Sequence, residues 1–191
     1  MKYLWVLAGA NGSGKSTFYR KFLADTGIPF INADEIAKVK FPEKTVEANQ
    51  KAQAEAHRLY HENLDKGDSF CYETVFSHHS KIEFLERARH FGYIINLGYI
   101  HLEDPDLNVL RVTQRVSEGG HDVPEYKIRG RITRTMDHIK KALVIVDEAD
   151  IYENSNDENP FALKASIKNG KFTFLDKPTP VWLSELTVLV G

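Results

Sequence analysis

Short apolar segments alternate with longer amphipathic segments along the first 150 of the 191 residues. Apolar runs of strand length occur at 2–8, 30–33, 69–76 and 93–102. Segments of helical spacing or composition follow them at 15–25, 46–66, 80–91 and 105–116, and one more helix is expected to begin near Pro124. Strands that alternate with helices form right-handed βαβ units. The pattern therefore predicts a mostly parallel, doubly wound sheet with helices on both faces.

The pattern changes near the C-terminus. Two strand-like segments, 161–167 and 171–175, flank Asn169-Gly170, which is a strong hairpin signal. We therefore expect one domain, residues 1–191, with a three-layer α/β fold and a C-terminal hairpin. The last segment, 177–191, is harder to assign: its prolines favour a loop, and 186–190 is compatible with a final strand.

Composition narrows the class of protein. Apolar residues make up 42% and charged residues 27%, with a formal net charge of −2, as is typical of a globular protein and not of a general nucleic-acid or membrane binder. No apolar run reaches the roughly 18 residues of a membrane span. Cys71 is the only cysteine, so no intrachain disulfide can form, and a reducing cytoplasm is the expected compartment.

The clearest chemical motif follows the first predicted strand. Gly9-Ala10-Asn11-Gly12-Ser13-Gly14-Lys15-Ser16 matches the P-loop pattern G-x-x-x-x-G-K-[ST]. Its glycines let backbone N–H groups curl around phosphate oxygens, and the following helix adds its partial positive charge. We expect Lys15 to bind the β- and γ-phosphates of ATP, Ser16 to ligate Mg²⁺, and Thr17 to lie near the α-phosphate.

A second segment allows two interpretations. Leu143-Val144-Ile145-Val146-Asp147-Glu148 is similar to a Walker B strand, in which Asp147 would hold Mg²⁺ and Glu148 would polarise water. Alternatively, Ile139, Leu143 and Val146 continue the helix that begins near Pro124, and a strand begins at Ala149. The helical spacing favours the second interpretation, with Asp147 and Glu148 as surface charges.

Two carboxylates follow the ends of predicted strands, where a doubly wound sheet binds its ligands. Asp34 follows the second strand and could accept a proton from a substrate hydroxyl; the alternative is a helix N-cap. Glu73, with Thr74 beside it, ends the third strand. A glutamate among apolar residues is costly to bury, which favours a role toward substrate or Mg²⁺, or else an ion pair with an internal arginine.

Arginines gather between residues 111 and 135, around a Gly119-Gly120 turn. Two helices joined by such a turn are typical of a lid, and guanidinium groups neutralise the charge that develops during phosphoryl transfer. The alternative is a solvated basic face. His121, in the turn, is a candidate substrate contact.

Taken together, these motifs resemble the zeta-toxin-like P-loop kinases, particularly the short stand-alone bacterial members, over roughly residues 1–175. The resemblance depends on the following segments, in this order: the P-loop, Asn32-Ala33-Asp34, Tyr72-Glu73-Thr74-Val75-Phe76-Ser77, Arg115 to Pro124, Ile128, Arg131, and the Glu153-Asn154-Ser155 turn. The chain departs from the usual pattern at Val75 and Phe76, where relatives often have Thr-Leu, and at Gly130, which interrupts an arginine run.

The resemblance implies a fold like that of small-molecule kinases and transfer of the γ-phosphate of ATP to a hydroxyl group, in the better-known toxins that of a UDP-amino sugar. It implies that Asp34 is the base, that Glu73 and Thr74 contact the acceptor, and that Arg115 and Arg131 contact the phosphate. It also implies an antitoxin-like protein as a candidate partner. The competing function is a P-loop ATPase or GTPase switch that acts on a protein partner without a small-molecule acceptor.

Overall fold

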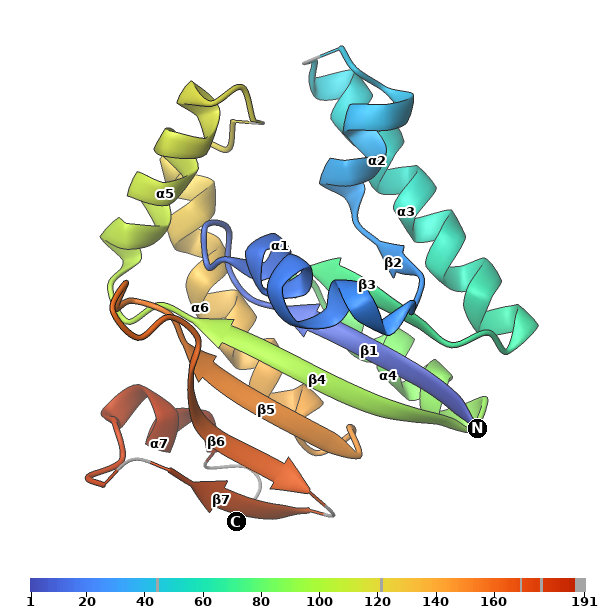
Figure 1. Ribbon diagram of the computed structural model, residues 1–191. Helices are drawn as coiled ribbons and strands as arrows, with labels where there is room; N and C mark the ends of the chain where they lie inside the picture. The colour runs from blue at the N-terminus through green and yellow to red at the C-terminus, as the bar shows by residue number, and fades with distance from the viewer. Residues whose placement is uncertain (44, 121, 169, 176, 188–191) are drawn as a thin grey trace.

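The computed structural model describes residues 1–43, 45–120, 122–168, 170–175 and 177–187. Its centre is a seven-stranded sheet with the strand order β2-β3-β1-β4-β5-β6-β7 (Figure 1). The strands are β1 (Lys2–Ala8), β2 (Phe30–Ile31), β3 (Phe70–Thr74), β4 (Tyr93–His101), β5 (Glu148–Glu153), β6 (Ala162–Lys168) and β7 (Lys171–Phe174). Strands β1 to β5 pair in parallel, and β6 and β7 add the antiparallel hairpin. The expected fold is thus confirmed, although Asn169 in the hairpin turn lies outside the described residues.

Helices lie on both faces of the sheet, in unequal amounts (Figure 1). They are α1 (Lys15–Phe18), the π-helical turn η1 (Tyr19–Leu23), the 3₁₀ turn η2 (Ala24–Thr26), α2 (Ala33–Lys40), α3 (Val46–Lys66), α4 (Ser80–His90), α5 (Pro105–Ser117), α6 (Glu125–Ala142) and α7 (Val181–Thr187). The main core contains apolar residues of α3, α4, α6 and α7. On the opposite face, Phe18 of α1 packs on Leu7 and Ile100. No helix in the described part of the chain is long and apolar enough to cross a membrane.

Strand β1 shows why the apolar run at the N-terminus forms a central strand. Leu4, Val6 and Ala8 enter the main core on one face, and Leu7 enters the smaller cluster on the other. A strand that is covered on both faces has little place for polar residues, as in parallel sheets generally.

The carboxyl ends of the parallel strands meet at one edge of the sheet. Ala8 at the end of β1 pairs in register with Thr74 of β3 and Tyr99 of β4, and His101 of β4 pairs with Glu153 of β5. Any residue that follows one of these strands therefore emerges at the same edge, where an open α/β sheet binds ligands.

The segment 143–148 differs from both sequence interpretations. Helix α6 ends at Ala142, and β5 begins at Glu148, one residue earlier than expected. Asp147 accepts a hydrogen bond from the Ile95 backbone N–H (2.8 Å) at the amino end of the parallel pair β4–β5. The Walker B interpretation is wrong because Asp147 lies at the amino ends of the parallel strands. The P-loop, in contrast, follows the carboxyl end of β1.

Other boundaries also differ. The helix expected at 15–25 has only one α-helical turn before it changes to π and 3₁₀ geometry. Strand β2 ends at Ile31 rather than at Ala33, so Asp34 lies in the first turn of α2. Leu186, expected in a final strand, lies in α7 and is buried against the core.

Candidate active site

The phosphate loop runs from the end of β1 into α1, where two of its glycines are confined by polar neighbours. A Cβ atom on Gly12 would lie 2.6 Å from the Asn108 carbonyl oxygen, and one on Gly14 would lie 2.6 Å from Asn154 Nδ2. Both have positive φ angles, +79° and +100°, which side chains rarely adopt. The loop therefore needs these glycines for its conformation as well as for access to phosphate.

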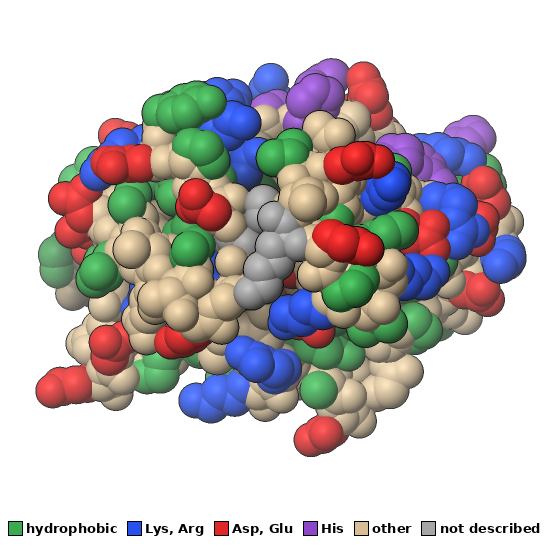
Figure 2. Space-filling view, turned by 90° about the horizontal axis from the view of Figure 1, so that it is seen from above, with side chains coloured by type: hydrophobic (Ala, Val, Ile, Leu, Met, Phe, Trp, Pro, Cys, Tyr) green, Lys and Arg blue, Asp and Glu red, His purple; other side chains and the backbone are tan. Residues whose placement is uncertain are grey.

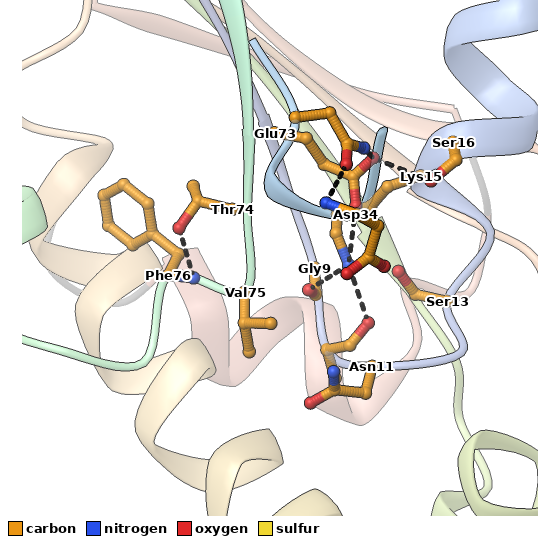
Figure 3. Close-up of polar contacts among 12 residues, drawn as sticks. Gly9, Asn11, Ser13, Lys15, Ser16, Asp34, Glu73, Thr74, Val75 and Phe76 are labelled. Atoms are coloured by element: carbon orange, nitrogen blue, oxygen red, sulfur yellow. Dashed lines mark hydrogen bonds and ion pairs between the residues drawn. The ribbon is translucent and has the colours of Figure 1, made fainter. Parts of the chain in front are cut away.

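Lys15 is buried under the loop, with 6% of its surface exposed. Its ammonium donates to the carbonyl oxygens of Gly9 (2.8 Å) and Ala10 (3.0 Å) and lies 3.7 Å from Glu73 Oε1 (Figure 3). Burial lowers the pKa of Lys15, Glu73 and Asp34 act in the opposite direction, and the Arg115 charge adds to the lowering. A nearby anion would favour the charged form in the same way as these carboxylates.

Glu73 is the centre of the polar cluster. Its Oε2 accepts hydrogen bonds from Ser16 Oγ (2.8 Å) and Asn32 Nδ2 (2.5 Å). The carboxylate thus connects β3, the first turn of α1 and the residue that precedes α2, and the alternative of an internal arginine partner is wrong. Asn32 also caps α2, since its Oδ1 accepts from the backbone N–H groups of Asp34 (2.7 Å) and Glu35. The N-cap of α2 is therefore Asn32, and not Asp34 as the sequence alternative proposed.

Asp34 contacts the lid segment. Its Oδ2 is 3.5 Å from Arg115 Nη1 at the end of α5, and its side chain remains half exposed. Asp34, Glu73 and Lys15 lie close together beside the loop (Figure 3). A half-exposed carboxylate next to the P-loop lysine has the access that a general base requires.

Arg131 approaches the loop from α6. Its Nη1 donates to Asn11 Oδ1 (3.1 Å), while Asn108 Nδ2 of α5 donates to the Asn11 carbonyl oxygen (2.7 Å). Burial, together with the neighbouring Arg134 charge, lowers the pKa of Arg131. Both helices of the predicted lid segment, 111–135, thus contact the P-loop. On the whole face seen in Figure 2, acidic and basic side chains are interspersed.

Asn154 holds the other side of the loop. Its Nδ2 donates to the Ser13 carbonyl oxygen (2.9 Å), and its Oδ1 accepts from the Phe161 backbone N–H (3.1 Å). Its own carbonyl oxygen accepts from Arg111 (3.0 Å). Asn154 is buried at the carboxyl end of the β5 segment, so it joins the P-loop to the loop before β6.

Some predicted residues lie outside this cluster. Thr74 points away from Glu73, because neighbouring strand residues face opposite sides, and its hydroxyl accepts from the Phe76 backbone N–H (3.0 Å) (Figure 3). Thr17 is exposed, and His121 lies outside the described residues. Sequence reasoning assigned no role to Asn32, Asn108 or Asn154. The only signal was that Asn32 and Asn154 belong to the segments that carry the family resemblance.

The donor set is suited to Mg²⁺. The Ser16 hydroxyl and the Glu73 carboxylate are hard oxygen donors in direct contact, and Mg²⁺ in nucleotide sites takes one or two protein oxygens and completes its shell with phosphate and water. Among the described residues no three His, Cys, Asp or Glu side chains are grouped to hold a metal ion without a nucleotide.

Comparison with known proteins identifies the family of the chain. The sequence model of the AAA domain family matches residues 4–136, which include the P-loop, Asp34, Glu73 and both lid arginines. The chain belongs to this family. An uncharacterized protein of Haemophilus influenzae is 32% identical over 137 residues, which cover 68% of this chain and 97% of that protein.

Solved structures show the same fold. A chain of the complex of AvrRxo1-ORF1 and ORF2 with ATP matches 98% of this chain with a TM-score of 0.72 and 15% identity; the match covers 64% of that longer chain. A chain of the PezAT toxin–antitoxin system of Streptococcus pneumoniae matches 86% of this chain and 72% of its own length, with a TM-score of 0.63 and 15% identity. At the level of the fold, these matches confirm the resemblance to the zeta-toxin-like P-loop kinases.

Proposed function

We propose that the protein is an ATP-dependent phosphotransferase that moves the γ-phosphate of ATP to a hydroxyl of a small molecule. The observation that carries the proposal is the contact of Asp34 with Arg115, 3.5 Å apart, beside the P-loop lysine. A carboxylate, a lid arginine and a phosphate-binding lysine at one edge of the sheet are the groups that phosphoryl transfer to a hydroxyl requires.

Each group has a separate role in this proposal. Residues 9–17 bind the phosphates of ATP, and Lys15 neutralises charge on the β- and γ-phosphates. Mg²⁺, held by the Ser16 hydroxyl with Glu73 behind it, screens the phosphate charge when bound. Asp34 accepts the proton of the acceptor hydroxyl, while Arg115 and Arg131 stabilise the charge on the transferred group.

The acceptor is proposed from the family resemblance. A UDP-amino sugar is the first candidate, bound between α2 and the lid segment near Asp34. The three partners of Glu73, namely Lys15, Ser16 and Asn32, favour a role for this carboxylate on the Mg²⁺ side of the site. Because the Thr74 hydroxyl is bonded within its own loop, a contact with the acceptor would require it to rotate.

An ATPase or GTPase switch that acts on a protein partner is the second candidate. It is supported by the names of two structural relatives, which are an ORF1–ORF2 complex and a toxin–antitoxin system. An antitoxin-like protein is therefore a proposed partner under either function.

The test is a screen of metabolite pools, with UDP-N-acetylglucosamine included, for transfer of label from γ-labelled ATP. We expect a labelled organic product with the unmodified protein and a loss of at least about a thousandfold in the rate with Asp34→Asn and with Lys15→Ala. Asp34→Asn should keep its affinity for ATP. Asp25→Asn, in the exposed η2 turn, is the matched control and should keep full activity.

Two results would contradict the proposal. Undiminished transfer by Asp34→Asn would remove the assignment of the base. If every pool yielded only inorganic phosphate, and a protein partner accelerated its release, the ATPase or GTPase switch would be favoured.

A further inference from the structure

A cavity of about 500 Å³ lies on the α1 face of the sheet, separate from the P-loop. Among the described helices, only the short helical segment Lys15–Thr26 covers the strands on this face, whereas α3, α4, α6 and α7 pack on the other (Figure 1). Gly98 deepens the floor, since a Cβ atom there would meet only Leu7 Cδ1, at 3.4 Å, and Val6 O, at 4.0 Å. The space is therefore a consequence of one short helical segment and one glycine.

Aromatic rings form one wall of the cavity. Phe18, Phe22, Tyr152 and Phe161 all line it, and the ring of Phe18 lies 4.8 Å from Phe22, 4.8 Å from Tyr152 and 5.4 Å from Phe161, measured between centroids. Phe22 is 48% exposed, so the aromatic wall is open to solvent on this side. Aromatic faces attract organic cations as well as other rings.

The floor of the cavity carries two carboxylates among mostly apolar residues. Glu148 and Asp150, two residues apart on β5, both line it, with Lys168 as the lysine among the lining residues. Lys168 pairs with Glu148 (3.0 Å) in an exposed contact. Asp150 instead accepts from the hydroxyl groups of Ser166 (2.6 Å) and Tyr152 (3.4 Å), and in the described part of the chain it forms no ion pair. A partly buried carboxylate with only neutral donors favours a cation.

We propose that this cavity binds a small organic cation with a planar aromatic ring, such as an aromatic amidine or amine, with its charge on Asp150 and its ring against the Phe18 cluster. The volume lies in the range of sites that enclose one small molecule. The two carboxylates of its floor lie under an aromatic wall, an arrangement that matches a charged ring rather than the apolar face of a helix.

The test uses isosteric probes of different charge: benzamidine, benzamide and benzoate. The chain has two tryptophans, and Trp5 lines the cavity, so a Trp182→Phe variant leaves the Trp5 indole N–H as a single reporter in ¹⁵N-resolved NMR spectra. We expect a saturable shift of this signal with benzamidine, a Kd about tenfold higher with benzamide, and no shift with benzoate.

Two variants locate the probe. Gly98→Leu fills the floor and should abolish the benzamidine shift. Asp150→Asn keeps an acceptor for Ser166 and should raise the benzamidine Kd about tenfold while the benzamide Kd stays constant. Glu47→Gln, on α3 with a 74% exposed side chain, should change neither. A benzamidine Kd that is unchanged in Asp150→Asn would overturn the proposal, and so would equal affinities for benzamidine and benzamide. A concentration-dependent Trp5 shift without probe would indicate a second copy of the chain on this face and would also overturn it.

Discussion

At the scale of single residues, Asn32 connects the two carboxylates of the site. Its side-chain oxygen caps α2 and holds the backbone of Asp34, while its amide nitrogen donates to Glu73. The position of Asp34 relative to the P-loop therefore depends on one side chain that is 97% buried. An amide is the natural side chain for this place because it donates and accepts at the same time.

We predict that Asn32→Ala lowers the free energy of unfolding by about 1 kcal/mol through the lost cap, and lowers kcat for phosphoryl transfer about tenfold or more. Asn32→Asp keeps the capping oxygen but places a second buried carboxylate beside Glu73, so it should lower both the free energy of unfolding and kcat. Unfolding curves and steady-state kinetics measure both effects.

The matched control is Thr45→Ala, which removes the cap of α3, a hydrogen bond from the Ala48 N–H to Thr45 Oγ1. It should cost a similar free energy of unfolding without changing kcat. If it slows the reaction as much as Asn32→Ala does, Asn32 acts on activity only through stability.

The contiguous part of the site could be predicted from the sequence, and the dispersed part could not. Residues 9–16 carry their own spacing, so the motif indicates the loop directly. Asn108 and Asn154 reach the same loop from positions 97 and 141 residues away from their partners. No local pattern encodes such contacts, because they depend on which strand ends become neighbours.

At the scale of elements, the turn after β5 supports the P-loop through Asn154. We predict that Asn154→Ala weakens ATP binding about tenfold, since it leaves the buried Ser13 carbonyl oxygen without this donor and frees the loop that leads to Phe161. Calorimetric titration with a non-hydrolysable ATP analogue measures the affinity.

Asn156→Ala is the control for this turn. Asn156 is exposed, and within the described residues its side chain accepts only from the nearby Glu158 N–H (2.8 Å). We expect unchanged affinity in this variant. Equal weakening by the two substitutions would show that the turn acts as a whole and that Asn154 has no special contact.

The packing of α4 on α3 contains a partly buried lysine. Lys81 Nζ donates to the Tyr60 hydroxyl (2.9 Å) and lies 4.8 Å from the centre of the Tyr60 ring. Burial lowers the pKa of Lys81 to about 8, from an ordinary value of 10.5. Between these two pH values the unfolded chain binds more protons than the folded one, so this lysine makes the free energy of unfolding rise with pH through that window.

We predict that Lys81→Met is more stable than the unmodified protein at pH 7, by roughly 2–3 kcal/mol, and that the difference shrinks as pH rises from about 8 to about 10.5. Urea unfolding at a series of pH values measures it. Lys38→Met, whose lysine side chain is 67% exposed, should follow the unmodified protein. A constant difference across the window would show that the amine titrates normally.

Element boundaries were harder to predict than element types. The hairpin β6–β7 and the helices α3 and α5 lie where sequence patterns place them, because each has a distinct turn or cap signal. The change to π and 3₁₀ geometry after Phe18 had no signal, since it depends on the contacts of Phe18 and Leu23 with strands far away in sequence. The Walker B interpretation of 143–148, which the helical spacing already disfavoured, could be rejected only from the structure for a similar reason: the position of a segment in the sheet decides its chemistry.

At the scale of the whole molecule, two helical units flank the phosphate loop at one edge of the sheet. Helices α2 and α3 lie on one side of it and α5 and α6 on the other (Figure 1). The ion pair between Asp34 and Arg115 joins the two units, and the hydrogen bond from Arg131 to Asn11 joins α6 to the loop. Charge on the transferred phosphate would attract both arginines, so we propose that the segment 111–135 closes on the nucleotide as a lid.

The arginines of α6 provide the test of this lid, because two of them lie two residues apart in different surroundings. Arg131 contacts the P-loop, whereas Arg129 pairs with Asp106 and Glu125 away from it. We predict that Arg131→Lys lowers kcat by about a hundredfold with little change in the KM for ATP, since a lysine cannot reproduce the planar contact in the transition state. Arg129→Lys should change kcat less than twofold. Single-turnover kinetics separate the chemical step from product release and measure this difference. An equal effect of the two substitutions would mean that α6 influences the reaction through its general charge. The lid would then lose its phosphate-contacting role.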